Sequence, residues 1–180
     1  MGLDASDIYG SFPFLSFLEA NFQTFLEEAL AAPVDAYVTM PSDETYEGTW
    51  RALPLAIGPW GHEFPGVDYA KNRALCPRTF ALLQQVEGLT VGGFLRVEAG
   101  TTILPHQDFR DDHEIRAHLG LRLPEHEAAY WPEGTARVID IRVRHGASNP
   151  GPGPRITLMV DVRMPFVVPT GAVPAWGAPG

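Results

Sequence analysis

The chain has 180 residues and a mass of 19.7 kDa, and its 45% hydrophobic and 19% charged residues are typical of one soluble globular domain. Its formal net charge of −9 argues against nucleic acid or an anionic membrane as a partner, because phosphate recognition needs clustered positive charge. Cys76 is the only cysteine, which excludes an internal disulfide. The first ten residues do not resemble a signal peptide, and no apolar run approaches the ~20 residues of a membrane span, so we expect a cytoplasmic protein.

Two helices are predicted in the first half of the chain. Residues 13–32 favour one amphipathic helix, because apolar residues recur every three or four positions, and Pro33 ends it. Residues 77–86 favour a shorter helix with Pro77 in its first turn. The apolar face of the first helix comprises Phe14, Leu15, Leu18, Phe22, Phe25, Leu26 and Leu30, and the glutamates off that face are Glu19, Glu27 and Glu28.

Residues 33–72 are rich in proline, glycine and aromatic side chains. We interpret them as short strands and long loops. Loops on a rigid scaffold often carry substrate contacts, and whether this region forms a mobile lid is left open.

From Val91 onward the hydrophobic period changes to two, which predicts strands. Several strands joined by Gly/Pro-rich turns after amino-terminal helices indicate a mainly β sandwich or barrel with helices outside. We therefore expect one domain over 1–180, with a helical segment at 1–32, a β core at 90–165 and a partly disordered tail at 166–180. The predicted strands are 94–97, 116–123, 137–145 and 155–162, with a tight connection at 146–154.

One group of residues could bind a metal. His106 and Asp108 are two positions apart, so both side chains point to the same face of an extended segment. His145 could join them from a distant strand. Two histidines and a carboxylate on one face of an octahedron suit iron(II) and leave positions for other ligands. A lone His-x-Asp is a weak signal, and His62, His113 and His126 are interpreted as loop or solvated residues.

Arginines near this group allow two interpretations. Arg116 and His118 share the polar face of a predicted strand, which either faces solvent or faces inward, where an arginine would need an anion. Arg155 opens another strand and is either a surface residue or a two-pronged anchor for the distal carboxylate of 2-oxoglutarate. Asn149 is either a turn residue or a hydrogen-bonding group near the ligands.

Several short motifs, taken in order, resemble the aspartyl/asparaginyl β-hydroxylase family across roughly residues 90–165. Such a series is far more specific than any one motif. Looser similarities are WRAL at 50–53 and CPRT at 76–79. The main motifs are LPHQD at 104–108, RAHLGL at 116–121, WPEG at 131–134, Asp140, and HGASN at 145–149 followed by Arg155.

The resemblance implies a double-stranded β-helix (jelly-roll) oxygenase that depends on iron(II), 2-oxoglutarate and O2. His106 and His145 would occupy the two histidine positions on the metal. Asp108 would complete the triad found in bacterial members that act on free or modified amino acids, whereas animal members lack this carboxylate. The other family positions would be Arg155, which holds the far carboxylate of 2-oxoglutarate, and Arg116 with His118, near the iron-proximal carboxylate and the substrate.

The implied reaction hydroxylates a small-molecule or peptidyl amino-acid substrate, such as an aspartyl or asparaginyl-like residue, at the β-carbon or a nearby C–H, and releases succinate and CO2. Alternatives are a non-catalytic metal-binding jelly-roll module, a cupin-type metalloenzyme that does not use 2-oxoglutarate, or an oxygenase that desaturates or cyclises. The oligomeric state is left open. Candidate substrate contacts are Trp50, Arg51, Arg96, Arg116 and Asn149, although Arg51 and Arg96 can equally be surface residues.

Overall fold

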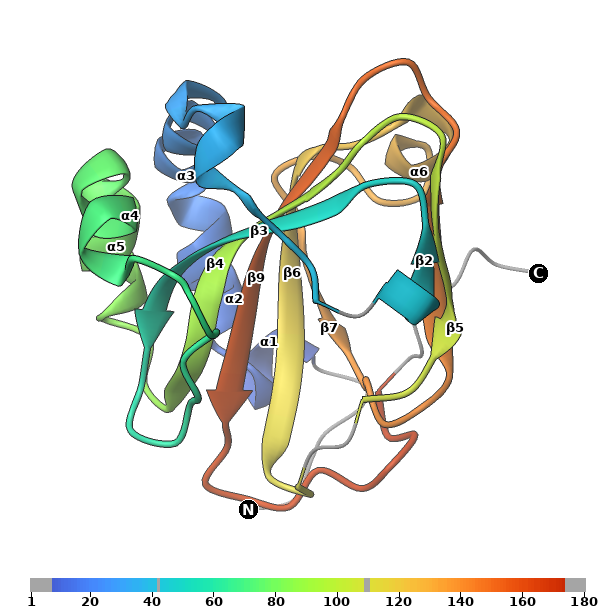
Figure 1. The fold of residues 1–180 in the computed structure, drawn as a ribbon. Coiled ribbons are helices and arrows are strands. Elements are labelled where there is room, and N and C mark those ends of the chain that lie inside the picture. Colours follow the sequence, from blue (N-terminus) through green and yellow to red (C-terminus); the bar gives the residue numbers. More distant parts are fainter. Residues whose placement is uncertain (1–7, 42, 109–110, 174–180) are drawn as a thin grey trace.

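A computed structural model describes residues 8–41, 43–108 and 111–173, and it contains two antiparallel sheets (Figure 1). The larger sheet has the order β1-β3-β4-β9-β6-β7, and the smaller has the order β2-β5-β8. The strands are β1 (Val38–Thr39), β2 (Tyr46–Glu47), β3 (Trp50–Ile57), β4 (Leu89–Val97), β5 (Thr101–His106), β6 (Glu114–Arg122), β7 (Ala136–Ile139), β8 (His145–Asn149) and β9 (Arg155–Arg163).

The path of the chain confirms the predicted double-stranded β-helix fold. From β4 it passes to β5 in the smaller sheet, returns to β6 and β7 in the larger sheet, crosses again to β8, and ends in β9 between β4 and β6. The sheets pack face to face through a small apolar cluster. Its buried members are Trp50, Ala52, Leu95, Val97 and Met159 from the larger sheet and Ile103 from the smaller.

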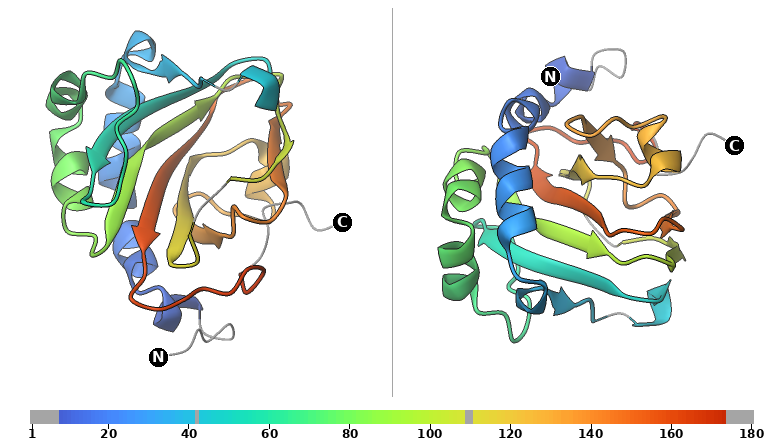
Figure 2. Two further views of the ribbon diagram at one scale, coloured as in Figure 1. Left: turned by 60° about the horizontal axis from the view of Figure 1, so that its bottom comes forward. Right: turned by 90° about the horizontal axis from the view of Figure 1, so that it is seen from above.

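The helices of the amino-terminal half of the chain cover the outer face of the larger sheet (Figure 2). The main core lies there, because side chains alternate along each strand. On β6, Ile115, Ala117, Leu119 and Leu121 are buried in that core, and Arg116 lies on the opposite, inner face. The helices are α1 (Ile8–Ser11), α2 (Phe14–Ala20), α3 (Phe22–Ala31), α4 (Tyr69–Leu75), α5 (Pro77–Leu83) and α6 (Glu125–Ala128), with short 3-10 turns at Val34–Ala36 and Asp43–Thr45.

The prediction of one long amino-terminal helix over 13–32 is wrong in three respects. The segment is divided at Asn21 into α2 and α3, and Leu30 is exposed. Glu28, predicted to lie off the apolar face, is buried. Its carboxylate accepts hydrogen bonds from the backbone N–H groups of Arg78 and Thr79, at 3.1 and 2.8 Å. Glu28 thus satisfies donors at the start of α5, where a helix lacks internal partners.

Three further predictions need correction. The region 33–72 contains the eight-residue strand β3 and the start of α4, rather than only short strands and loops. The strand predicted for 137–145 is two strands, because β7 ends at Ile139 and β8 begins at His145 in the other sheet. The connection predicted for 146–154 is shorter, because β8 continues to Asn149.

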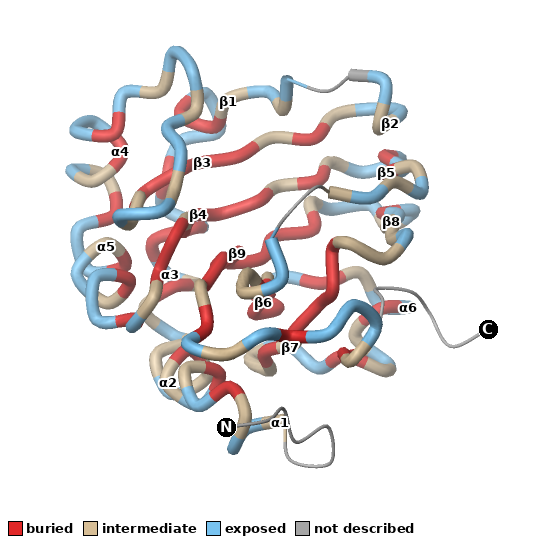
Figure 3. The backbone as a smooth tube through the Cα atoms, turned by 90° about the horizontal axis from the view of Figure 1, so that it is seen from below, coloured by how far each residue is buried: buried red, intermediate tan, exposed pale blue. Residues whose placement is uncertain are grey.

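The described part of the tail packs onto the domain, as Val168 and Val173 are both buried, and the remainder of the predicted disordered tail lies outside the described residues. Figure 3 shows that the central strands of the larger sheet are buried along most of their length. Within the described ranges, no helix is long and apolar enough to cross a membrane.

Candidate metal centre and cleft

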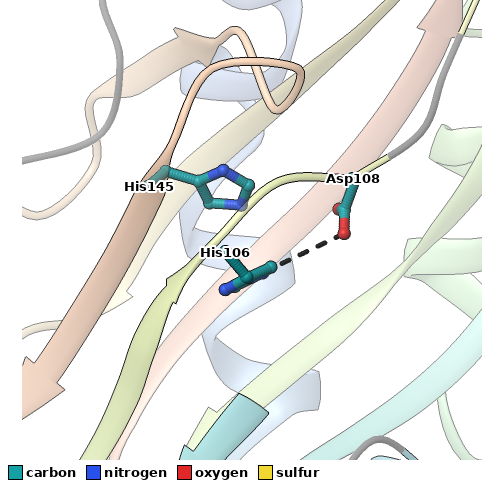
Figure 4. A group of neighbouring side chains, drawn as sticks. All are labelled: His106, Asp108 and His145. Carbon is teal, nitrogen blue, oxygen red and sulfur yellow. Dashed lines mark ion pairs between the residues drawn. The ribbon is translucent and has the colours of Figure 1, made fainter.

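The three predicted metal ligands meet where two neighbouring strands of the smaller sheet pair (Figure 4). His106 ends β5 and is paired in register with His145, which begins β8. Asp108 follows two residues after His106. One ligand atom from each of the three residues lies within 4.8 Å of the others. The strand register therefore brings His145 next to His106, although the two residues are 39 positions apart in the chain.

Both histidines are oriented by backbone carbonyls. Nδ1 of His106 lies 2.7 Å from the oxygen of Leu104, and Nδ1 of His145 lies 2.9 Å from that of Val143. A carbonyl oxygen only accepts, so each Nδ1 carries the hydrogen and each Nε2 keeps its lone pair for a ligand. Burial also lowers the pKa of His145, which favours the neutral imidazole that a metal requires.

The carboxylate of Asp108 is held by an arginine from the facing sheet. Arg116 Nη1 donates to Asp108 Oδ2 at 3.0 Å, and Asp108 Oδ1 lies 4.0 Å from Nε2 of His106. Arg116 also forms a two-pronged pair with Asp161, at 2.7 and 2.8 Å. Burial alone would lower the pKa of Arg116, but Asp161 and then Asp108 raise it, so the guanidinium stays charged.

This donor set fits iron(II). Two imidazole nitrogens and one carboxylate oxygen, each fixed by a further hydrogen bond, match the arrangement of non-haem iron oxygenases and leave positions open for other ligands. The three ligand residues are only partly buried, so small molecules can reach them.

The other predicted cosubstrate residues form a buried polar cluster. Arg155 makes a two-pronged pair with Glu127 of α6, from Nε at 2.6 Å and Nη2 at 3.0 Å, and both residues are at most 3% exposed. The Arg155 guanidinium also lies 5.6 Å from the centre of the Trp131 ring. His118 Nδ1 lies 3.1 Å from Thr157 Oγ1, and burial followed by the charge of Arg116 lowers its pKa, so the ring is neutral.

A cleft of about 240 Å³ opens beside the metal centre, on the inner face of the larger sheet. Trp50, one of the predicted substrate contacts, lines it, and its ring centre lies 6.3 Å from that of His106. The indole N–H of Trp50 is buried and has no acceptor among the described residues. The charged lining residues besides His106 are Asp108, Arg116 and Asp161, and the apolar ones include Met40, Ala52, Pro54, Phe64, Val91, Leu95 and Met159.

The sequence matches the model of the aspartyl/asparaginyl β-hydroxylase family over residues 19–165, which include β3 to β9 and all three triad residues. The chain belongs to this family. A curated relative, an ornithine lipid ester-linked acyl 2-hydroxylase from Rhizobium tropici, is 32% identical over 114 residues, which are 58% of this chain and 40% of that protein. The chain thus spans less than half the length of that relative.

Two solved structures are similar to this family member in part. One is a predicted oxalate decarboxylase from Thermotoga maritima, with 10% identity and a TM-score of 0.41 over 71% of this chain and 92% of that one. The other is a Pseudomonas putida prolyl-4-hydroxylase, with 15% identity and a TM-score of 0.34 over 83% of this chain and 87% of that one.

The structure places two predicted substrate contacts away from the cleft. Arg51 and Arg96 are paired across β3 and β4, and neither lines the cleft, because alternation along β3 turns Trp50 and Arg51 to opposite faces. Arg96 instead pairs with Glu98 at 2.7 Å. These two residues are corrected from substrate contacts to residues of the other sheet face.

Asn149 has a structural position. Its side chain is fully buried, and its Nδ2 donates to the backbone oxygens of Val97 and Gly153 at 2.9 and 2.8 Å. Its Oδ1 accepts from the N–H of Gly151. The amide closes the turn after β8, so the turn interpretation replaces the one that brought Asn149 near the ligands.

Sequence reasoning missed Asp161 and Glu127. Asp161 carried a usable signal, because it is a lone carboxylate in the apolar run of β9, and a buried charge needs a partner. Glu127 carried none, because it lies in an acidic segment with Glu125 and Glu133 that is typical of a solvated surface.

Proposed function

We propose that this family member is an iron(II)- and 2-oxoglutarate-dependent hydroxylase. The observation that carries the proposal is the cluster of His106, Asp108 and His145, with both imidazoles oriented and the carboxylate clamped. With bound iron(II), O2 and 2-oxoglutarate would convert a substrate C–H into C–OH and yield succinate and CO2.

The residues of the chain would position the cosubstrate. Arg155 is the proposed anchor for the far carboxylate of 2-oxoglutarate, and Thr157 and His118 lie beside it on the same inner face. Glu127 already engages Arg155. A guanidinium has five N–H donors on two edges, so it can serve two carboxylates, although Glu127 reduces the positive charge that 2-oxoglutarate would meet.

The resemblance-based prediction of an amino-acid or aspartyl/asparaginyl-like substrate, small or peptidyl, is one candidate. The name of the Rhizobium tropici relative adds a second, an acyl chain hydroxylated at C2. The apolar lining of the cleft favours the second candidate.

Anaerobic titration of iron(II)-loaded protein with 2-oxoglutarate tests the proposal without a substrate. We expect a weak visible charge-transfer band that is lost in His106→Ala and Arg155→Ala. His62→Ala, which removes an exposed histidine outside the triad, serves as the matched control and should retain the band. Metal binding without any band would instead favour a cupin-type enzyme or a non-catalytic metal-binding module.

A further inference from the structure

We propose that the cleft accepts an apolar hydrocarbon chain rather than an acidic group, and that Asp161 determines this preference by neutralising Arg116. The inference deepens the proposed function, because it names the substrate class of the same site. It rests on the composition of the cleft wall and on the contacts of Arg116, which lines it.

The cleft wall nearest the metal centre is mostly hydrocarbon. Trp50, Leu95 and Met159 belong to the apolar cluster between the sheets, and they also line the cleft. A chain lying against them would bury apolar surface on both sides, which is the main favourable contribution to binding of such a ligand. An ionised group at the same place would lose its hydration.

Among the residues that the structure describes, the cleft offers an acidic substrate no uncompensated cationic side chain. Among the described residues that line it, Arg116 is the only arginine or lysine. Asp161 engages its Nε and Nη2, and Asp108 engages its Nη1. A divalent metal ion and dianionic 2-oxoglutarate cancel in charge, so one arginine and two aspartates leave the loaded site with an excess of negative charge that disfavours a substrate carboxylate.

The other candidate arginines do not change this balance. Arg51 and Arg96 lie on the opposite face of the sheet, and Arg96 is paired with Glu98. The same contacts give Arg116 a different role, since its Nη1 donates to the carboxylate of Asp108, a proposed metal ligand. Asp161 is therefore a positioning residue for Asp108, as well as the residue that removes positive charge from the cleft.

Binding of two amide-capped probes to the Mn²⁺-loaded protein saturated with 2-oxoglutarate tests the proposal, because the cosubstrate then occupies metal positions that a probe carboxylate could otherwise bind. N-decanoylglycinamide offers an apolar chain, and N-acetylaspartate amide offers a carboxylate. Calorimetry gives both affinities, and broadening of probe proton resonances by Mn²⁺ reports proximity to the metal centre. We expect the decanoyl probe to bind at least about tenfold more tightly, with its chain protons broadened.

Two variants and one control show which residues set the preference for the decanoyl probe. Asp161→Asn should reduce the ratio of the two affinities by about tenfold or more, because it releases the charge of Arg116. Met159→Gln should weaken the decanoyl probe without strengthening the acidic one. Asp111→Asn removes an exposed carboxylate that pairs with Arg163 outside the cleft, and should leave the ratio unchanged.

Equal binding of both probes to the wild-type chain would overturn the proposal, as would an unchanged ratio in Asp161→Asn. If Asp161→Asn does not fold, Met159→Gln still tests the proposal. An unaltered affinity for the decanoyl probe would show that its hydrocarbon tail does not occupy this cleft. The proposed function fails separately, through a missing 2-oxoglutarate band with the decanoyl probe still bound in calorimetry.

Discussion

Two arginine–carboxylate pairs on the inner face of the larger sheet have different surroundings. Near the cleft, Arg116 pairs with Asp161 and donates a further hydrogen bond to Asp108. Toward the other end of β9, Arg155 pairs with Glu127 beneath α6 and lies against Trp131. We call these the cleft pair and the anchor pair.

Both pairs are two-pronged, but they border different spaces: the cleft pair lines the cleft, whereas Glu127 of the anchor pair lines a separate surface hollow together with Tyr130 and His145. Both residues of the anchor pair are nevertheless at most 3% exposed, so their side chains are almost closed to solvent. Under the proposed function the same kind of pairing would serve two purposes: the cleft pair would fix the carboxylate of a metal ligand, and the anchor pair would keep an arginine buried and oriented before 2-oxoglutarate binds.

Removal of the cleft arginine should have the largest effect. Arg116→Ala leaves Asp161 buried without its main partner, so we expect the free energy of unfolding to fall by about 3–5 kcal/mol. Because Asp108 also loses its clamp, Co²⁺ affinity should fall by about 10–100-fold. Urea unfolding and a Co²⁺ titration measure the two effects.

Asp111→Asn is the matched control for the cleft pair. It disrupts an arginine–carboxylate pair that is half exposed, and should change stability by about 1 kcal/mol or less. A loss of stability in Arg116→Ala with unchanged Co²⁺ affinity would show that Arg116 supports the fold but does not position the ligand.

Sequence reasoning was most effective where strand alternation and register decide the outcome. Alternation placed Arg116 and His118 on one face of the predicted strand, and the structure resolves the open choice by turning Arg116 inward. The triad required only that His106 and Asp108 share a face and that a second strand deliver His145. These are local rules of the extended chain, so a single sequence contains them.

Pairwise partners across the fold were much harder to predict. Glu127 meets Arg155 and Glu28 meets the start of α5 because of how α6 and α3 dock, and neither position differs in pattern from a solvated glutamate. Likewise, the division of the first helix at Asn21 follows from packing on the sheet, since the apolar spacing alone continues through it.

We expect a smaller effect when the charge of the anchor pair is changed. Glu127→Gln retains hydrogen-bonding atoms but removes the negative charge, so we expect a loss of about 2 kcal/mol in unfolding free energy. The charge of Arg155 would then be less compensated, so 2-oxoglutarate should bind more tightly and raise the melting temperature by more than in the wild type. Differential scanning fluorimetry with and without 2-oxoglutarate measures both changes.

Glu125→Gln, at an exposed position of the same helix, controls for changes in α6 itself and should alter neither quantity. Weaker 2-oxoglutarate binding in Glu127→Gln would contradict the prediction that Glu127 competes with 2-oxoglutarate for Arg155. It would mean that Glu127 is needed to hold Arg155 in position.

The smallest expected effect comes from the hydroxyl of Thr157, which lies on the same strand as Met159 but nearer the anchor pair. Thr157→Val keeps the shape of a fully buried side chain but removes the hydroxyl 3.1 Å from His118 Nδ1. One hydrogen bond contributes about 1 kcal/mol, so stability should fall by that amount and 2-oxoglutarate affinity by about fivefold at most. Met159→Leu, two residues along the same face of β9, should leave 2-oxoglutarate affinity unchanged because Met159 lines the cleft. Calorimetric titration of the iron(II)-loaded variants with 2-oxoglutarate compares them, and equal losses in both would show that the cosubstrate extends across both regions.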